Sequence, residues 1–266
     1  MATPAPQESR PAPSAAPARR PLSALGVLRQ IVGSTLFNLE MWLSVLVYAP
    51  LMLLTFPLPF RWRYYLISRW AKFQVWLIGV LCGVHYRVEG LERLPPGPAV
   101  VMAKHQSTWE TFALPVLLPP QTWVLKRELM WVPLFGWALA LLKPIAIDRA
   151  SRREAFQQVI EQGRERLREG IWVTVFPEGT RVPPGQRGRW RHGGAVLAAE
   201  TGYPVVPVAH NAGLYWPRRA FIKRPGVIRV VIGPSIDTRG LSGAEVARRS
   251  EEWVMRTTEE LERSAE

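Results

Sequence analysis

The feature that most constrains this chain is an uncharged, apolar stretch at residues 41–60, MWLSVLVYAPLMLLTFPLPF. Together with the apolar residues 31–39 ahead of it, this stretch is long enough to reach across the hydrocarbon core of a bilayer. A segment of this length and composition favours lipid over water. We therefore expect a membrane protein that is attached through its N-terminal part.

A second apolar segment follows at residues 64–82, but it carries Arg69 and Lys72. A single membrane span usually concentrates basic residues on one side. Here they flank the first apolar helix on both sides, at Arg19, Arg20, Arg29, Arg61 and Arg63. Two helices that enter one leaflet and return fit these charges, and they keep everything downstream on the cytoplasmic face of the membrane (the inner membrane if the source is bacterial). The alternative is a single span followed by a helix on the membrane surface.

Composition divides the chain into three parts. Residues 1–21 are rich in Pro and Ala without apolar periodicity, which predicts a disordered tail. Residues 22–83 form the predicted two-helix anchor, and residues 84–266 form a folded domain. The formal net charge of +13 requires an anionic partner, and the 12 tryptophans favour a membrane over nucleic acid because Trp prefers the bilayer interface.

From residue 84 onward, short β-rich runs alternate with helical stretches, which predicts an α/β fold with a mixed, partly parallel sheet flanked by helices. The expected strands are residues 85–88, 99–103, 122–125, 145–147, 171–176, 205–209 and 227–232. The expected helices are residues 107–118, 128–142, 152–169, 194–201 and 244–260.

His105 is the best candidate for a catalytic base among the four histidines, His85, His105, His192 and His210. It follows an apolar strand and precedes a helix start, where open α/β sheets bind ligands. Glu110 is five residues further on, close enough to support the imidazole. Ser107 and Glu110 also match a capping box, so the sequence leaves open whether Glu110 only begins the helix.

A second group of polar residues, Phe176-Pro-Glu-Gly-Thr-Arg181, ends the apolar strand at 171–176. The guanidinium of Arg181 can form a bidentate hydrogen-bonded contact with phosphate, and Glu178 can accept a hydrogen bond from a substrate hydroxyl. Lys126 and Arg149 follow two other expected strands. If the strands are parallel, this loop and these basic residues lie at the same sheet edge as His105. The alternative for the loop is an ordinary turn closed by a Glu–Arg pair, and the alternative for each of the other basic residues is a solvated surface charge.

Several kinds of chemistry lack their usual sequence motifs. The chain has no G-x-S-x-G nucleophile elbow, no Walker loop, and no G-x-G-x-x-G after a strand. Its single cysteine, Cys82, and its four histidines do not form a pair with metal-ligand spacing. We therefore expect no metal and no cofactor, and a histidine base beside an anion pocket suits transfer of a group onto a substrate hydroxyl.

These motifs resemble those of the glycerolipid acyltransferases, more narrowly the 1-acyl-sn-glycerol-3-phosphate acyltransferases. The pair His105 and Glu110 is similar to the H-x4-D motif of that family, and residues 176–181 are its F-P-E-G-T-R block as it stands. Residues 145–149 resemble the second motif and residues 206–208 the fourth. Order and spacing agree over residues 84–232, and two apolar helices ahead of the domain are also usual in the family.

The resemblance implies a role for each matched residue. His105 is the base and Glu110 its partner, while the acyl acceptor is held by Glu178, Gly179, Thr180 and Arg181, with Arg149 and Lys126 sharing its phosphate. Pro207 shapes the acyl-donor side. The sequence departs from the family at two points, because Glu110 replaces Asp and Lys143-Pro144 replaces a Gly before the second motif.

The reaction implied is transfer of a fatty acyl group from acyl-CoA or acyl-carrier protein to the sn-2 hydroxyl of lysophosphatidate, giving phosphatidate. An alternative is the same chemistry on another lysolipid, such as lyso-ornithine lipid. An alternative of another class is a membrane-anchored basic protein that binds nucleic acid. The scatter of the basic residues over loop ends fits that alternative poorly, so no nucleic-acid partner is expected.

Overall fold

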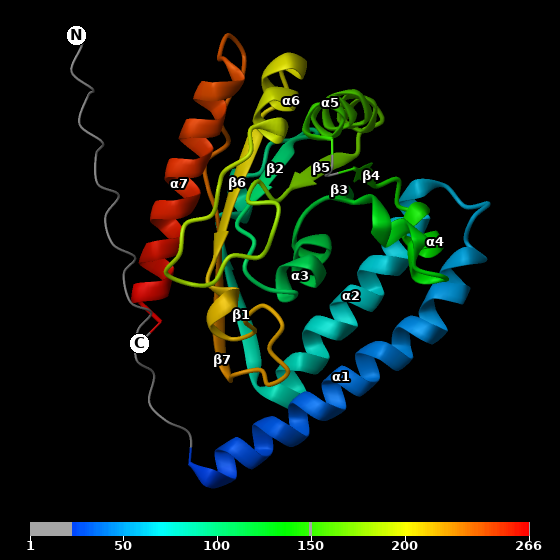
Figure 1. Ribbon diagram of the computed structural model, residues 1–266, viewed down its shortest axis with the longest axis vertical. Coiled ribbons are helices and arrows are strands. Elements are labelled where there is room, and N and C mark those ends of the chain that lie inside the picture. Colours follow the sequence, from blue (N-terminus) through cyan, green and yellow to red (C-terminus); the bar gives the residue numbers. More distant parts are fainter. Residues whose placement is uncertain (1–22, 149–150, 266) are drawn as a thin grey trace, which may run out of the picture.

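A computed structural model describes residues 23–148 and 151–265 of the chain (Figure 1). The predicted tail at residues 1–21 and the candidate Arg149 lie outside these residues. Within them, the elements follow in the order α1 (Ala24–Leu53), α2 (Phe60–Cys82), β1 (Val84–Glu89), η1 (Leu91–Arg93), β2 (Val100–Ala103), α3 (Trp109–Leu117), β3 (Gln121–Lys126), η2 (Arg127–Trp131), α4 (Phe135–Ala140), β4 (Ile145–Ile147), α5 (Arg152–Arg168), β5 (Trp172–Val175), α6 (Gly193–Thr201), β6 (Val205–His210), η3 (Ala212–Leu214), β7 (Gly226–Ile232) and α7 (Gly243–Arg263).

The strands of the described residues form one seven-stranded sheet in the order β1-β7-β6-β2-β5-β3-β4. All neighbouring pairs are parallel except β6 with β7, which is antiparallel. The predicted mixed, partly parallel sheet is therefore confirmed, and each expected strand matches an observed one to within one residue at either end. Because β2, β3, β4, β5 and β6 run in the same direction, the loops that follow them meet at one edge of the sheet.

Each face of the sheet is covered by helices, so the domain has three layers (Figure 1). Side chains alternate along each strand. In β2, Val101 and Ala103 pack in a cluster with residues of α1, α2 and α3. Val100 and Met102, from the same strand, pack on the opposite face in a cluster with residues of α5, α6 and α7.

The helices α1 and α2 form an antiparallel pair at the N-terminal end of the described chain (Figure 1). They approach closely at Gly33, where an added Cβ would lie 2.1 Å from the carbonyl oxygen of Leu81. Phe37, Ile78 and Cys82 are fully or almost fully buried in the cluster that also contains β1 and β2 residues. The boundary at residue 83 is therefore a change in composition and not a gap in the packing.

Among the described residues, α1 is the one helix that is long and apolar enough to cross a membrane. At about 1.5 Å per residue it is roughly 45 Å long. Its outward side chains are apolar, for example Trp42 and Leu46, which are 67% and 61% exposed. The second apolar segment forms α2, which does not meet the same criterion, and so the two-helix anchor remains a prediction.

One expected helix is wrong. Residues 128–142 do not form a continuous helix but the short η2 and α4, separated by residues 132–134. Pro133 has no N–H to donate and disfavours helical backbone in the residue before it. Leu134 has a positive φ of 61°, which no α-helix contains. By contrast, α5 begins as expected, with Ser151 Oγ accepting a hydrogen bond from the backbone N–H of Glu154.

Candidate active site

The loop between β2 and α3 carries His105 and is closed by one carboxylate. Glu110, in the first turn of α3, is fully buried. Its Oε1 accepts hydrogen bonds from the backbone N–H groups of Gln106 and Ser107, at 2.9 and 2.8 Å. Ser107 Oγ accepts a further hydrogen bond from the N–H of Trp109. These bonds satisfy donors that a helix start leaves without intrahelical partners, and they set the course of the loop.

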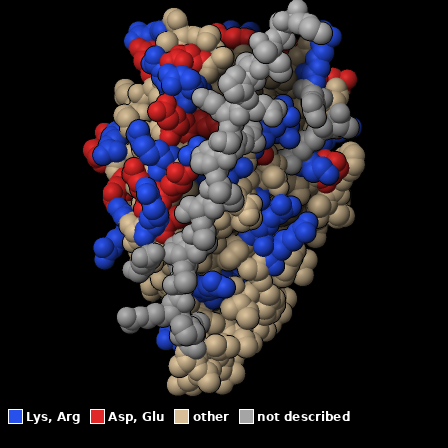
Figure 2. Space-filling view, turned by 60° about the vertical axis from the view of Figure 1, so that its left-hand side comes forward, with Lys and Arg blue, Asp and Glu red and all other residues tan. Residues whose placement is uncertain are grey.

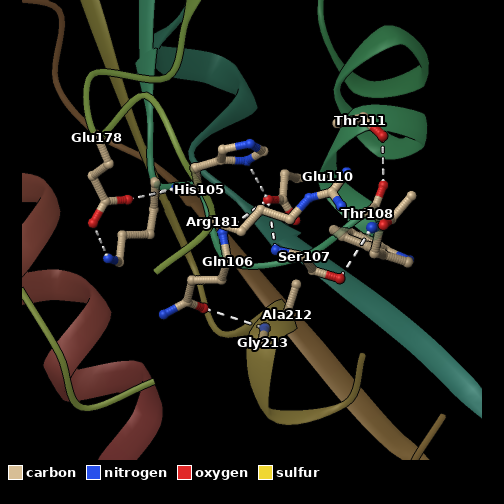
Figure 3. A network of polar contacts seen from close by, with 12 residues as sticks. His105, Gln106, Ser107, Thr108, Glu110, Thr111, Glu178, Arg181, Ala212 and Gly213 are labelled. Carbon is tan, nitrogen blue, oxygen red and sulfur yellow. Dashed lines mark hydrogen bonds and ion pairs between the residues drawn. The ribbon is translucent and has the colours of Figure 1, made fainter. Parts of the chain in front are cut away.

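The same oxygen of Glu110 also contacts the imidazole. Oε1 lies 2.9 Å from Nδ1 of His105, so Nδ1 carries the proton and donates it to the carboxylate (Figure 3). The His105 ring stacks on Phe176, with 4.2 Å between ring centroids and 21° between the planes. Glu110 thus holds the edge of the ring and Phe176 its face. No hydrogen bond to Nε2 is present within the described residues, so this nitrogen can accept one.

The charge state of the carboxylate suits this arrangement. Burial by itself raises the pKa of Glu110, but the neighbouring His210, the hydrogen bond from His105 and the N–H of Ser107 outweigh burial and lower that pKa below its ordinary value. Glu110 is therefore ionised at neutral pH. A carboxylate in this position fixes the imidazole tautomer and stabilises the imidazolium that forms when Nε2 takes a proton.

His210 is a second histidine beside Glu110, is fully buried, and belongs to no sequence motif that predicts a role for it. Its Nε2 donates to the carbonyl oxygen of Lys104 at 2.9 Å, and its Nδ1 accepts from the N–H of Ala212 at 3.3 Å. Nε2 also lies 4.0 Å from Oε2 of Glu110. Burial lowers the pKa of His210, which favours the neutral ring. A histidine at the end of an apolar strand was the available signal.

Glu178 holds the other side of the His105 loop. Its Oε1 forms an ion pair with Nζ of Lys104, and its Oε2 accepts from the backbone N–H of His105 at 2.9 Å (Figure 3). The side chains of Lys104 and Glu178 are 1% and 0% exposed. Both carboxylate oxygens of Glu178 thus have partners within the protein. Glu178 is not among the residues that line the cavity beside His105.

A cavity of about 1180 Å³ opens beside His105. Its apolar wall comes from α1, α2, α3 and residues 129–142, and its polar wall comes from the loops that follow β3 and β5. Gly179, Thr180, Arg181 and Lys126, for which the resemblance implies contact with the acceptor, all line it. Lys126 is also paired with Glu128, at 2.7 Å.

Arg181 brings a positive charge to the wall of this cavity. It lines the cavity, and its Nε is buried with no hydrogen-bond partner within the part of the chain that the structure describes. Arg218, which sequence reasoning missed, lines the same cavity and donates from Nη1 to the carbonyl oxygen of Arg181 at 3.4 Å. No motif surrounds Arg218 in the sequence, and only the fold brings it to the cavity.

Comparison with known proteins gives concordant results. The family model described as "Acyltransferase" matches residues 85–211. The chain is 48% identical over 237 residues to a 1-acyl-sn-glycerol-3-phosphate acyltransferase of Pseudomonas aeruginosa, covering 87% of this chain and 92% of that protein. It is 32% identical over 174 residues to the human 1-acyl-sn-glycerol-3-phosphate acyltransferase alpha, covering 64% of this chain and 61% of that one.

A solved structure shares the fold. The crystal structure of the 1-acyl-sn-glycerophosphate (LPA) acyltransferase PlsC from Thermotoga maritima superposes with a TM-score of 0.75 at 25% sequence identity. The superposition covers 89% of this chain and 97% of the other. Most of the chain therefore has a counterpart in that structure.

Proposed function

Since the chain belongs to the 1-acyl-sn-glycerol-3-phosphate acyltransferase family and is an enzyme of that class, we propose the following reaction for it. A fatty acyl group moves from acyl-CoA or acyl-carrier protein to the sn-2 hydroxyl of 1-acyl-glycerol-3-phosphate, giving phosphatidate. His105 is the general base, and no acyl-enzyme forms. The observation that carries this proposal is the His105–Glu110 pair at the cavity wall, with Nδ1 bound to the carboxylate.

The proposed step is a direct transfer. Nε2 of His105 takes the proton of the sn-2 hydroxyl while the hydroxyl oxygen attacks the thioester carbon. The C–S bond then breaks, and the thiolate leaves with the proton that the imidazolium returns. Glu110 stabilises the imidazolium between these two events, because it stays ionised inside the protein.

The acceptor phosphate is proposed to bind Arg181, with Gly179, Thr180 and Lys126 beside it. A phosphomonoester carries close to two negative charges at neutral pH. The buried Nε of Arg181 has no partner among the described residues, which supports a ligand contact there. Arg149 belongs to the same proposal, as the resemblance implies. Glu178 is assigned a different task, because both of its oxygens already hold Lys104 and His105.

The apolar part of the cavity is proposed to take acyl chains. Its wall includes the partly buried Met41 and Val45 of α1 and Phe112 of α3. The exposed apolar surface of α1 supports attachment to a membrane at its cytoplasmic face, where lysophospholipid acceptors lie. With α2 beside it, residues 22–83 are proposed to form the anchor and residues 84–266 the acyltransferase domain.

The direct test replaces the base. His105→Ala should lower turnover roughly 10²–10⁴-fold with lysophosphatidate and either thioester donor, the range for loss of a general base. The matched control is His85→Ala, which removes an exposed histidine of β1 that does not line the cavity. Near-normal turnover in a folded His105→Ala protein would refute the proposed mechanism.

A further inference from the structure

The interrupted segment at residues 129–142, LMWVPLFGWALALL, contains no charged residue. In a water-soluble domain, a surface segment of this length usually carries several charges. Two of its largest side chains nevertheless point away from the protein. Trp131 is 64% exposed and Trp137 is 53% exposed.

The two sides of this segment have different neighbours. Leu134, Phe135 and Leu139 line the active-site cavity. Trp131 and Trp137 are not among the lining residues, and their exposure places them on the outer surface. The segment is therefore a wall between the cavity and whatever surrounds the protein.

The outer surface of this wall continues the apolar surface of α1. Ala138 of α4 packs in a small cluster with Ala49 and Met52, near the C-terminal end of α1. Figure 1 shows α4 beside the end of the α1–α2 pair. The connection between those two helices is also apolar and exposed, with Leu54 at 76% and Phe56 at 73%.

Basic side chains border the apolar wall. The guanidinium of Arg127 lies over the Trp131 ring, 5.7 Å from its centroid, and Lys126 precedes it in the chain. Tryptophan next to Arg or Lys is the combination enriched where a protein meets lipid headgroups, because the ring is apolar and the cation contacts phosphate.

We propose that Leu129–Leu142 enters the cytoplasmic leaflet as a third membrane-contacting element beside α1 and α2. This rests on the proposed membrane attachment of the enzyme. Lipid fits the surface better than a protein partner does. A protein interface carries about one hydrogen bond per 100–200 Å², and the side chains of this segment offer no polar group except the two indole N–H donors.

The consequence concerns the acyl chains. One face of the segment contacts lipid and the other lines the cavity, so only the thickness of this wall separates the bilayer from the acyl-binding space. An acyl chain then needs no transfer through water to move between the leaflet and the cavity beside α1.

Site-specific labelling can test the proposal on the full-length enzyme. The single native cysteine, Cys82, is buried, so a thiol-reactive fluorophore will label an introduced cysteine. The test positions are Trp131→Cys and Trp137→Cys, with Ala140→Cys as an exposed position that removes no large side chain. Trp42→Cys reports on α1, and Arg256→Cys on the exposed surface of α7 is the control in water.

Each labelled protein is reconstituted in phosphatidylglycerol–phosphatidylethanolamine vesicles with and without doxyl-labelled lipid.

We expect the label at positions 131, 137 and 140 to show a blue shift and doxyl quenching comparable to position 42, and position 256 to show neither. Quenching at 42 without quenching at 131, 137 and 140 would overturn the third element and leave the anchor intact. Absence of quenching at 42 would overturn the proposed anchor itself. If the tryptophan variants misfold, the label at position 140 decides alone. Quenching at 140 supports the third element, and its absence beside quenching at 42 overturns it.

Discussion

A single carboxylate, Glu110, combines two roles that the sequence left as alternatives. Its Oε1 accepts from two backbone N–H groups that begin α3 and also from Nδ1 of His105. The capping bonds and the imidazole contact use the same atom. The start of the helix and the orientation of the His105 imidazole are thus one structural unit, and a substitution at this position affects both.

Glu110→Gln separates the charge from the shape. In the variant, the amide oxygen can still accept hydrogen bonds from the loop N–H groups, but the negative charge is lost. The amide nitrogen takes the place of Oε2, which in the wild type lies 4.0 Å from Nε2 of His210. We expect turnover to fall roughly 10²–10⁴-fold, because an uncharged partner cannot stabilise the imidazolium. The measurement is the turnover number beside thermal unfolding. Turnover that falls only as far as stability would mean that Glu110 acts as a cap alone.

The pH dependence of this variant follows from the lowered pKa of Glu110. A carboxyl whose folded pKa lies below its unfolded value stabilises the folded protein above the unfolded pKa, and this stabilisation is lost as pH falls through the folded pKa. The stability difference between wild type and Glu110→Gln should therefore not shrink from about pH 8 down to about pH 5, and it should shrink only below that. A difference that disappears between pH 7 and pH 6 would contradict an ionised, depressed Glu110.

Arg181→Lys tests the acceptor at the level of one side chain. Lysine keeps the charge but loses the planar pair of donors that can hold two phosphate oxygens. Loss of one charge-assisted hydrogen bond corresponds to about a 10- to 150-fold drop in catalytic efficiency. The drop should appear with lysophosphatidate and be much smaller with a lysolipid that lacks the terminal phosphate. Arg187→Lys, in an exposed ion pair with Glu259, is the matched control. An equal loss on both acceptors would make Arg181 structural.

Sequence reasoning identified the residues that belong to ordered motifs and missed those that depend on strand order. His105 and Glu110 are five positions apart, so one loop and one helical turn place them together. Lys104 and His210 gain their roles from pairing across the sheet. Lys104 meets a carboxylate 74 positions away, and His210 meets the Lys104 carbonyl because β6 lies beside β2. Periodicity and composition do not encode which strands are neighbours.

At the scale of elements, α1 is joined to the domain by a buried lysine. Nζ of Lys223 donates to Asn38 Oδ1 on α1 and to the carbonyl oxygen of Phe221. It also lies 4.7 Å from the centroid of the Trp216 ring and 5.2 Å from that of Phe37. These contacts fasten the first half of α1 to the segment before β7. The helix α1 is thus fixed relative to the sheet.

Lys223→Met keeps the length of the side chain and removes its charge. Burial lowers the pKa of Lys223 from 10.5 to about 8. Between these values the unfolded chain binds more protons than the folded one, so the unfolding free energy of the wild type rises with pH. Relative to Lys223→Met, the wild type should gain at most ~3 kcal/mol from pH 7 to pH 10. Thermal unfolding in detergent measures this, with the half-exposed Lys143→Met as control. If the difference in unfolding free energy between wild type and Lys223→Met does not depend on pH, burial does not lower the pKa of Lys223.

The elements also show where local sequence signals stop. Residues 128–142 were expected to form one helix, yet the chain breaks at Pro133 and Leu134. The backbone at Gly136 lies very close to that of η2, because an added Cβ at Gly136 would lie 2.4 Å from the carbonyl oxygen of Met130. The chain thus folds back on itself at a distance that only glycine permits. A proline inside an apolar run was visible in the sequence, whereas the close backbone contact was not.

Over the whole molecule, charge and apolar surface are separated. Figure 2 shows Lys, Arg, Asp and Glu side chains gathered over the upper part of one face, while the lower end of that face consists mainly of uncharged residues. The exposed side chains of α1 are largely apolar along its length. The positive net charge and this apolar surface provide two independent forces toward an anionic membrane, and salt distinguishes between them.

Vesicle flotation at two salt concentrations tests which force holds the protein. Charge attraction is screened over about 10 Å at 0.1 M salt and about 3 Å at 1 M, whereas burial of apolar surface is not weakened by salt. The full-length protein should therefore stay on phosphatidylglycerol vesicles at 1 M salt and also bind neutral phosphatidylcholine vesicles. The double variant Trp42→Asp, Leu46→Asp places two charges where lipid is expected, each costing roughly 2.5–3.5 kcal/mol at a bilayer centre. It should bind only anionic vesicles and be released by salt. Release of the wild type by salt, or its displacement by a DNA competitor, would instead indicate a peripheral basic protein held by charge.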